Sequence, residues 1–86
     1  MFTVEYAMEA PKELTKLDKA VARRALKAID ALALNPRPSG TRQPVGHSNL
    51  WRIQVGDYRI VYAIRDSELV VLALRIAHRS DVYRNL

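Results

Sequence analysis

Arginines alternate with apolar side chains in WRIQVGDYRIVYAI, residues 51–64, and this spacing is the first sign of chemistry in the chain. Gly56-Asp57 is a two-residue hairpin signal, because glycine supplies the positive φ that the first position of a type II′ turn requires. The predicted turn sets the residues that face each other across the hairpin: Val55–Tyr58, Gln54–Arg59, Ile53–Ile60, Arg52–Val61 and Trp51–Tyr62.

Side chains of a strand alternate between two sides, so the predicted hairpin has a core face and an open face. The core face is apolar and aromatic: Trp51, Ile53, Val55, Tyr58, Ile60, Tyr62 and Ile64. The open face carries the polar groups among small apolar ones: Arg52, Gln54, Arg59, Val61 and Ala63. Two cations on neighbouring strands repel each other unless an anion lies between them, so the pattern predicts an anion site. The alternative is an open face whose arginines are spread apart in water.

Arginine, histidine and tyrosine recur in RIAHRSDVYR, residues 75–84. If the last predicted strand pairs with residues 58–64, its end lies near the first arginine of that arm. His78, Arg79 and Tyr83 would then converge on the same end of the open face. The side to which Arg79 points depends on the pairing register, which a bulge can change. The alternatives are a hydrogen-bonded surface histidine and a tail tyrosine packed on the sheet edge.

A connector without periodicity, NPRPSGTRQPVGHSN, spans residues 35–49. It is longer than the usual ~4–6 residues, and connectors of this length tend to be binding elements or mobile. Arg37 and Arg42 are therefore candidate contacts to a polyanion, and His47 lies in the same segment. The alternative is a plain linker between helix and sheet.

The N-terminal part of the chain predicts a strand and two helices. Residues 2–6 alternate apolar and polar side chains, which is typical of a strand. Pro11 fits the first turn of a short helix that ends near Leu17, because an N–H in the first turn has no intrahelical partner. Asp18 can cap a second helix, and Asn35-Pro36 ends it, because the residue before a proline is disfavoured in the α region. The expected apolar face of this second helix is Val21, Ala22, Ala25, Leu26, Ile29, Leu32 and Ala33.

From Leu50 onward the pattern is that of strands. Asp66-Ser67 marks a second turn, and LVVLALRIA, residues 69–77, is apolar on both faces, as expected of a covered central strand. A strand, two helices and an antiparallel meander together predict a small single α+β domain over residues 1–86. We expect both helices on one face of the sheet.

The charge of the chain is strongly positive. Its 86 residues hold 14 Lys+Arg against 9 Asp+Glu, which gives a formal net charge of +5 and a pI near 10.0. This balance favours a polyanionic partner, either nucleic acid or an acidic protein. All the lysines precede Asn35 and every later cation is an arginine, whose planar fork holds phosphate with two parallel hydrogen bonds. The alternative is GC-rich codon usage with a solvated surface.

Several kinds of site are not expected. The chain has no cysteine and only two histidines, His47 and His78, so we expect no disulfide, no metal site and no cofactor. No apolar run approaches the ~20 residues that cross a bilayer, and the N-terminus lacks the basic-then-apolar order of a signal peptide. We therefore expect a cytoplasmic protein that does not bind membranes.

These residues carry a family resemblance. LWRIQVGDYRIVYAI followed by VLALRIAHRSDVYR resembles the signature of the RelE/ParE superfamily of bacterial toxin–antitoxin toxins, over essentially the whole chain. The resemblance implies the fold derived above. For RelE-type members it also implies ribosome-dependent cleavage of messenger RNA in the ribosomal A site. That reaction is metal-independent, and a 2′-hydroxyl attacks the adjacent phosphate.

The resemblance also implies roles for single residues. Arg59 and Arg79 match the arginines that hold the scissile phosphate, and Arg52 matches a basic residue on the preceding strand. Tyr83 matches the tyrosine that stacks on or orients the substrate base. The expected RNA contacts are Arg37, Arg42, Arg52 and Gln54.

Gln54 departs from the family pattern. It stands where RelE toxins carry a second lysine, proposed as the proton acceptor, and an amide cannot act as a general base. His78, beside Arg79, is the alternative base, because an imidazole titrates near neutral pH. It is equally compatible with a spectator role. The departure puts the rate, and the activity itself, in question.

Two other functions stay open at this point. A ParE-like toxin binds and poisons DNA gyrase without nuclease activity, and it shares the VGDYRIVY hairpin. A degenerate toxin kept only as a binding partner is the third possibility. Arg59 and the His-Arg…Tyr ending favour RNA cleavage. The family also implies a cognate antitoxin, acidic and RelB-like, through which the complex contacts operator DNA.

Overall fold

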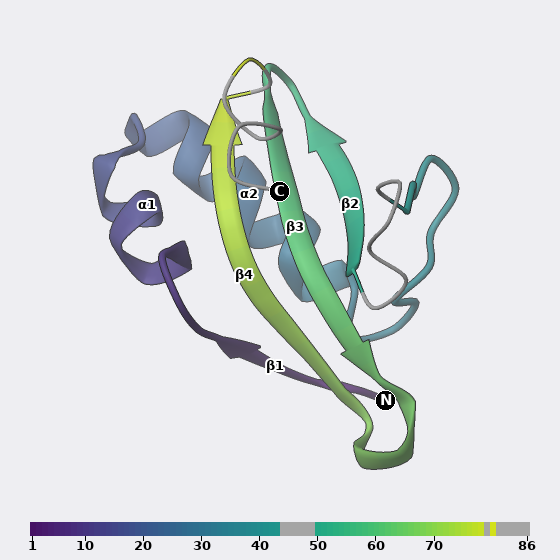
Figure 1. Cartoon of the computed structure of the whole chain (residues 1–86). Helices are drawn as coiled ribbons and strands as arrows, with labels where there is room; N and C mark the ends of the chain where they lie inside the picture. Colours follow the sequence, from purple (N-terminus) through teal and green to yellow (C-terminus); the bar gives the residue numbers. More distant parts are fainter. Residues whose placement is uncertain (44–49, 79, 81–86) are drawn as a thin grey trace.

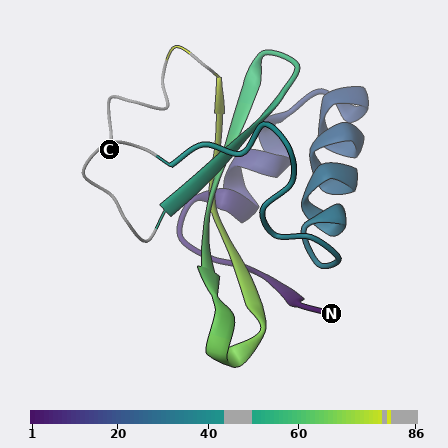
Figure 2. The same cartoon turned by 90° about the vertical axis from the view of Figure 1, so that its right-hand side faces the viewer.

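A computed structural model describes residues 1–43, 50–78 and 80, and it contains four strands and two helices (Figure 1). In chain order the elements are β1 (Thr3–Tyr6), α1 (Ala10–Lys16), α2 (Lys19–Ala31), β2 (Leu50–Val55), β3 (Tyr58–Arg65), the 3-10 turn η1 (Asp66–Glu68) and β4 (Val70–His78). The strands form one sheet in the order β1-β4-β3-β2. Figure 2 shows α2 against one face of the sheet, and Ala10 and Leu14 of α1 pack into the same core, so the predicted α+β layout is confirmed.

The β2–β3 hairpin has the predicted register. All five expected pairs are present, from Val55 opposite Tyr58 to Trp51 opposite Tyr62. Gly56 has φ +60°, whereas Asp57 is not among the described residues with positive φ, as a type II′ turn requires. Local turn chemistry and side-chain alternation therefore suffice to set this pair of strands.

The strand β4 is covered on both edges along its first half. It pairs antiparallel with β3 and parallel with β1, where Thr3 lies opposite Val70 and Tyr6 opposite Ala73. Because this pairing is parallel, the sheet is mixed. The α1–α2 segment therefore crosses over one face of the sheet between β1 and the strands of the meander. The apolar character of residues 69–77 is explained by this central position.

The core lies between the helices and the sheet. Its fully buried side chains come from α1, α2, β3, β4 and the turn after α2: Ala10, Ala25, Ile29, Leu32, Ile60, Tyr62, Val71, Ala73 and Ile76. Trp51, Ile53, Val55 and Ile64 pack against them, so the predicted core face of the hairpin is confirmed except at Tyr58, whose ring contacts His78 instead. The opposite face is less open than predicted, because Val61, Ala77 and Leu50 form a second small apolar cluster there.

Helix α2 differs from its prediction in three respects. It ends at Ala31 and continues as turns, four residues before the predicted stop. Leu26 is 40% exposed, because the buried positions follow a narrow stripe at spacings of four and three residues that excludes it. Asp18 takes the N-cap position without a side-chain capping hydrogen bond. No helix in the described part of the chain is long and apolar enough to cross a membrane.

A bulge in β4 changes which side chains share a face. Val61 pairs with Arg75 whereas Tyr62 pairs with Ala73, so Leu74 is an extra residue between them. Because one residue is added, odd-numbered residues face the helices before the bulge and even-numbered residues face them after it. His78 consequently lies on the helix side of the sheet.

Glu13 of α1 bonds to the edge of β4 beyond the residues that pair with β1. The last backbone bond from the β1 side runs from the Ala7 N–H to the Ala73 carbonyl, at 2.9 Å. Further along, the Glu13 carboxylate accepts the N–H of Ile76 at 2.7 Å and the Arg75 guanidinium at 3.0 and 3.1 Å. The side chains of Glu13 and Arg75 are each 18% exposed, so this ion pair fastens α1 to the sheet largely away from water.

Candidate anion-binding site

Three arginines from three segments gather on the open face of the sheet. Arg59 lies on β3, Arg52 on β2 and Arg42 on the connector. Arg42 and Arg52 exchange backbone hydrogen bonds, with N···O distances of 2.9 and 2.7 Å, and so form an isolated antiparallel bridge at the outer edge of β2. Directly opposed residues of an antiparallel pair project to the same face, so the bridge places Arg42 beside Arg52.

These arginines line a cavity of about 230 Å³, called here the arginine pocket. Its lining residues are Gly40, Arg42, Arg52, Ile53, Gln54 and Arg59. Pockets for drug-sized ligands measure roughly 300–1,000 Å³, so this pocket suits a smaller group such as a phosphate and its neighbouring sugar. Arg52 and Arg59, the arginines of the predicted anion site, therefore line a cavity together with a third arginine, Arg42, that the hairpin alone did not provide.

The positively charged side chains of the arginine pocket repel one another. Partial burial lowers the pKa of Arg52, and the charges of Arg59 and Arg42 lower it further. A guanidinium stays protonated at neutral pH in spite of such a shift, so the pocket carries concentrated positive charge. An anion that enters converts this repulsion into attraction, which is the property a phosphate site needs.

Gln54 projects on the same face, paired with Arg59 across the hairpin. Its Nε2 donates to the Gly56 carbonyl at 2.9 Å, which orients the amide beside the pocket. An amide donates and accepts hydrogen bonds and does not titrate. The pocket residues Arg42, Arg52, Gln54 and Arg59 thus include no group that exchanges a proton near neutral pH.

The structure does not bring His78 together with these arginines. His78 pairs with Tyr58, and their rings meet edge to face at 5.6 Å with an interplanar angle of 82°. Its Nδ1 lies 2.9 Å from the Ser80 hydroxyl oxygen. A separate cavity of about 290 Å³, lined in part by Glu13, Tyr58 and His78, lies on this helix side. The extra residue in β4 is the reason for the separation, and it corrects the predicted convergence for His78.

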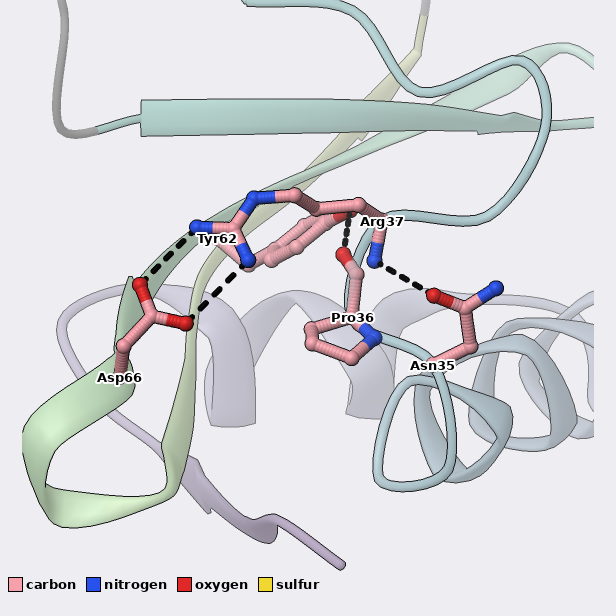
Figure 3. A network of polar contacts seen from close by, with 5 residues as sticks. All are labelled: Asn35, Pro36, Arg37, Tyr62 and Asp66. Carbon is pink, nitrogen blue, oxygen red and sulfur yellow. Dashed lines mark hydrogen bonds and ion pairs between the residues drawn. The ribbon is translucent and has the colours of Figure 1, made fainter.

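Arg37 is not among the residues that line the pocket, and Figure 3 shows its hydrogen bonds. Its guanidinium donates to both carboxylate oxygens of Asp66, at 3.2 and 3.0 Å, and sits 5.0 Å from the centre of the Trp51 ring. The hydrogen-bonded pair raises the pKa of Arg37 and lowers the pKa of Asp66. Nearby, the buried Tyr62 hydroxyl donates to the Pro36 carbonyl at 2.7 Å. Arg37 therefore ties down the start of the connector.

Sequence reasoning missed Asp66 and Tyr62 as anchors of the connector. One local signal was present, because Asn35 followed by proline is typical of a turn in which the asparagine side chain accepts an N–H two residues on. The structure has this bond, from the Arg37 N–H to Asn35 Oδ1 at 3.2 Å. The ion pair with Asp66 joins positions 29 residues apart and has no local signature.

The remaining expected site residues are Arg79 and Tyr83, and both lie outside the described residues, as does His47. Their roles stay predictions. Within the described ranges, no group of three or more histidine, aspartate or glutamate side chains is arranged to hold a metal ion.

Comparison with known proteins places this geometry in a family. The model of the family described as ParE toxin of type II toxin–antitoxin system, parDE, matches residues 4–83. The chain is 29% identical to toxin RelG of Mycobacterium tuberculosis, over 96% of this chain and 97% of that protein. Its fold is similar to that of RelE in the archaeal RelE–RelB complex from Pyrococcus horikoshii, with a TM-score of 0.79, 29% identity, and coverage of 91% and 94% of the two chains.

The isolated RelE toxin of Escherichia coli shows the same fold over the full length of both chains, with a TM-score of 0.79 at 22% identity. The family match spans residues 4–83, which is nearly all of the sequence, and the solved toxin shares the fold. The chain therefore belongs to the RelE/ParE superfamily, as a toxin of a type II toxin–antitoxin system.

Proposed function

We propose that this toxin is an endoribonuclease that cleaves messenger RNA in the ribosomal A site, by metal-independent attack of a 2′-hydroxyl on the adjacent phosphate. The observation that carries the proposal is the arginine pocket, where Arg42, Arg52 and Arg59 surround a cavity of about 230 Å³. Similarity to proteins named RelE and RelG supports it.

The chemistry needs charge stabilisation above all. Attack by a 2′-hydroxyl produces a pentavalent phosphorane whose equatorial oxygens carry extra negative charge, and it ends in a 2′,3′-cyclic phosphate and a free 5′-hydroxyl. Guanidinium groups that are already in place stabilise such charge without reorganising at the moment of reaction. In this proposal Arg59 and Arg52 hold the scissile phosphate, and Arg42 contacts it or the next phosphate along the strand.

The described residues of the site include no evident group for proton transfer. Gln54 cannot accept a proton, and His78 lies on the other side of the sheet. Arg79 and Tyr83, assigned by resemblance as a second phosphate ligand and as the residue that orients the base, complete the proposed site. We therefore expect slow cleavage that depends on phosphate stabilisation rather than on general base catalysis.

Primer extension on transcripts from cells that express the toxin tests the proposal. Cuts within codons that disappear when translation is blocked are the expected result. Arg59→Ala should lower the cleavage rate by about 10²–10³, the usual effect of removing a preorganised anion-stabilising group. Arg65→Ala is the matched control, because Arg65 lies on the same strand and the same side, away from the pocket, beside Glu68. Equal rates for both variants would refute the assignment of Arg59.

A gyrase-binding function is the second candidate, because the family description that matches residues 4–83 is ParE. In that case expression produces DNA-damage signalling while transcripts stay intact. Arg59→Ala then has no effect on transcript ends, since there is no cleavage to lose. A chain that produces neither response acts only as a binding partner.

We also propose a cognate antitoxin as the toxin's partner. The net charge of +5 suits an acidic, RelB-like chain, and the Pyrococcus horikoshii structure is described as a RelE–RelB complex. Charge complementarity of this kind speeds association more than it slows dissociation. Co-expression with a short acidic protein encoded next to the toxin gene should suppress toxicity, and the association rate should fall steeply with salt. Contact with operator DNA is expected only through the antitoxin.

A further inference from the structure

Arg42 occupies the arginine pocket against electrostatic repulsion. It is carried by the connector and not by a regular strand, and two backbone hydrogen bonds to Arg52 hold it at the edge of β2. The positive charges of Arg42 and Arg59 both act on Arg52. Repulsion between the like charges of Arg42 and Arg52 opposes these two backbone hydrogen bonds. The position of Arg42 therefore also depends on how the rest of the connector is anchored.

The start of the connector, residues 35–37, is anchored by the contacts that Figure 3 shows. Arg37 makes a two-pronged ion pair with Asp66 at 3.0 and 3.2 Å and lies over the Trp51 ring. The fully buried Tyr62 donates to the Pro36 carbonyl at 2.7 Å. We call the contacts of Arg37 with Asp66 and Trp51 the clasp.

The clasp and the pocket lie on opposite sides of β2. Their connector residues, Arg37 and Arg42, are close together in the sequence. Trp51 and Arg52 are neighbours in the strand and point to opposite faces, and the connector runs around the outer edge of β2 from one to the other (Figure 2). Between Arg37 and Arg42 the chain makes one tight turn, in which the Thr41 N–H donates to the Pro38 carbonyl at 3.1 Å. A turn this short leaves little slack, so a displacement of Arg37 is passed on to Arg42.

We propose that the Arg37–Asp66 pair is a positioning device that holds Arg42 in the arginine pocket for contact with the RNA phosphate. Arg37 and Asp66 are positioning residues, because neither lines the pocket. The proposal rests on the proposed function for its RNA ligand, whereas the hold on Arg42 is a property of the fold alone. The two statements can therefore be tested separately.

Asp66→Asn is the test variant and Glu68→Gln is its matched control. Both residues lie on η1, both are exposed, and both substitutions remove one negative charge. Glu68 pairs with Arg65, at 3.8 Å, and not with the connector. Any general gain in attraction for RNA from the added positive charge is the same in both variants. A loss of binding in Asp66→Asn alone is consequently specific to the clasp.

Amide hydrogen exchange measures the hold on Arg42 without any ligand. Since the Arg42 N–H is bonded to the Arg52 carbonyl, its exchange reports opening of the bridge. We expect faster exchange at Arg42 in Asp66→Asn and unchanged exchange in Glu68→Gln. Equal exchange at Arg42 in the two variants would overturn the proposal.

The salt dependence of RNA binding measures the consequence. The probe is a single-stranded oligoribonucleotide with 2′-deoxy substitutions that prevent cleavage. Loss of one phosphate contact reduces the slope of log K against log salt concentration by about 0.7. Arg42→Ala and Asp66→Asn should each reduce the slope, by up to that amount, and the double variant should not go below Arg42→Ala. Additive losses would show that Asp66 acts independently of Arg42 and would contradict the proposal.

The exchange and binding measurements give different results if the proposed function is wrong and if the clasp has no role. If the wild-type chain does not bind the probe while Arg42 exchange still responds to Asp66→Asn, binding of free RNA is refuted and the hold on Arg42 stands. Cuts within codons in translating cells test the ribosome-dependent activity separately. If the wild-type chain binds the probe with the same slope as Asp66→Asn and Arg42→Ala, the pocket works without Arg42 and the clasp has no role in it.

Discussion

Arg59 and His78 project from opposite faces of the sheet, although they occupy neighbouring positions of adjacent strands. Arg59 lies opposite Ala77, and His78 lies opposite Tyr58 on the side of the helices. The extra residue Leu74 in β4 produces this arrangement, because it reverses the alternation of all later side chains in the strand. An imidazole on the helix side does not reach a hydroxyl group bound among the arginines. The described residues of the pocket thus concentrate positive charge and include no group that acts as a base at neutral pH.

A lysine at position 54 should therefore raise the cleavage rate. Gln54 projects beside Arg59, at the position where the family resemblance implies a lysine, and an ammonium close to two guanidinium groups has a lowered pKa. Gln54→Lys is expected to accelerate cleavage by about 10²-fold, the lower end of the range for a positioned general base. The rate should rise with pH as the lysine loses its proton. Gln54→Arg adds the same charge but cannot lose a proton at neutral pH, so equal acceleration by both variants would rule out base catalysis at this position.

Substitution of His78 should leave cleavage nearly unchanged. The ring contacts Tyr58 and Ser80 on the far side of the sheet from the arginine pocket. We expect His78→Gln to change the rate by less than about threefold, which corresponds to roughly 0.7 kcal/mol in the activation free energy. The pH–rate profile should keep its shape as well. A rate loss of two orders of magnitude would show that His78 takes part in the chemistry after all.

Inorganic phosphate should stabilise the folded protein through the arginine pocket. An anion that binds only the folded state raises the unfolding free energy by RT ln(1 + [L]/Kd), about 2.7 kcal/mol at 100 times Kd. Thermal unfolding in phosphate and in chloride at equal ionic strength measures the difference. Arg59→Ala should remove the phosphate-specific rise in Tm, whereas Arg65→Ala should retain it. A rise that survives Arg59→Ala would place the anion elsewhere.

Glu13 should be among the most sensitive polar positions for stability. Its carboxylate accepts the Ile76 N–H at 2.7 Å and pairs with Arg75, and both side chains of the ion pair are 18% exposed. Glu13→Ala leaves an N–H and a guanidinium without their acceptor, which should cost about 2 kcal/mol of unfolding free energy. Glu13→Gln should cost less, since its carbonyl can still accept the N–H. Glu9→Ala, an exposed glutamate at the start of the same helix, is the control. Denaturant unfolding curves compare the three variants.

The contribution of Asp66 to stability should vanish in acid. Its hydrogen bonds from Arg37 lower the pKa of Asp66 below the ordinary value of 3.8. Because the pKa is lower in the folded state, ionised Asp66 stabilises the fold above pH ~4, and this contribution is lost as the pH falls through the folded-state pKa. The Tm of the wild type should therefore exceed that of Asp66→Asn near pH 6 and converge with it below pH ~3. A constant gap across this range would argue against the ion pair, and Glu68→Gln corrects for removing a carboxylate from the turn.

Much of the site's framework follows from local sequence. Gly56-Asp57 sets a turn with one residue at positive φ, and alternation from that turn assigns every side chain of β2 and β3 to a face. The arginine face and the core face were thus predictable, and so was the covered strand over residues 69–77. These features depend on neighbours only a few positions apart, so a single sequence carries them.

The tertiary structure alone decided the features that join distant positions. Four contacts have no periodic or local signal in the sequence. They are the bridge between Arg42 and Arg52, the ion pair of Arg37 with Asp66, the bonds of Glu13 to β4, and the parallel pairing of β1 with β4. The bulge at Leu74 is of the same kind, because no local sequence signal marks it; it lies directly after the four residues of β4 that pair with β1. The amino-acid sequence by itself therefore determined where the arginines face, and only the packing of the whole chain determined which groups stand beside them.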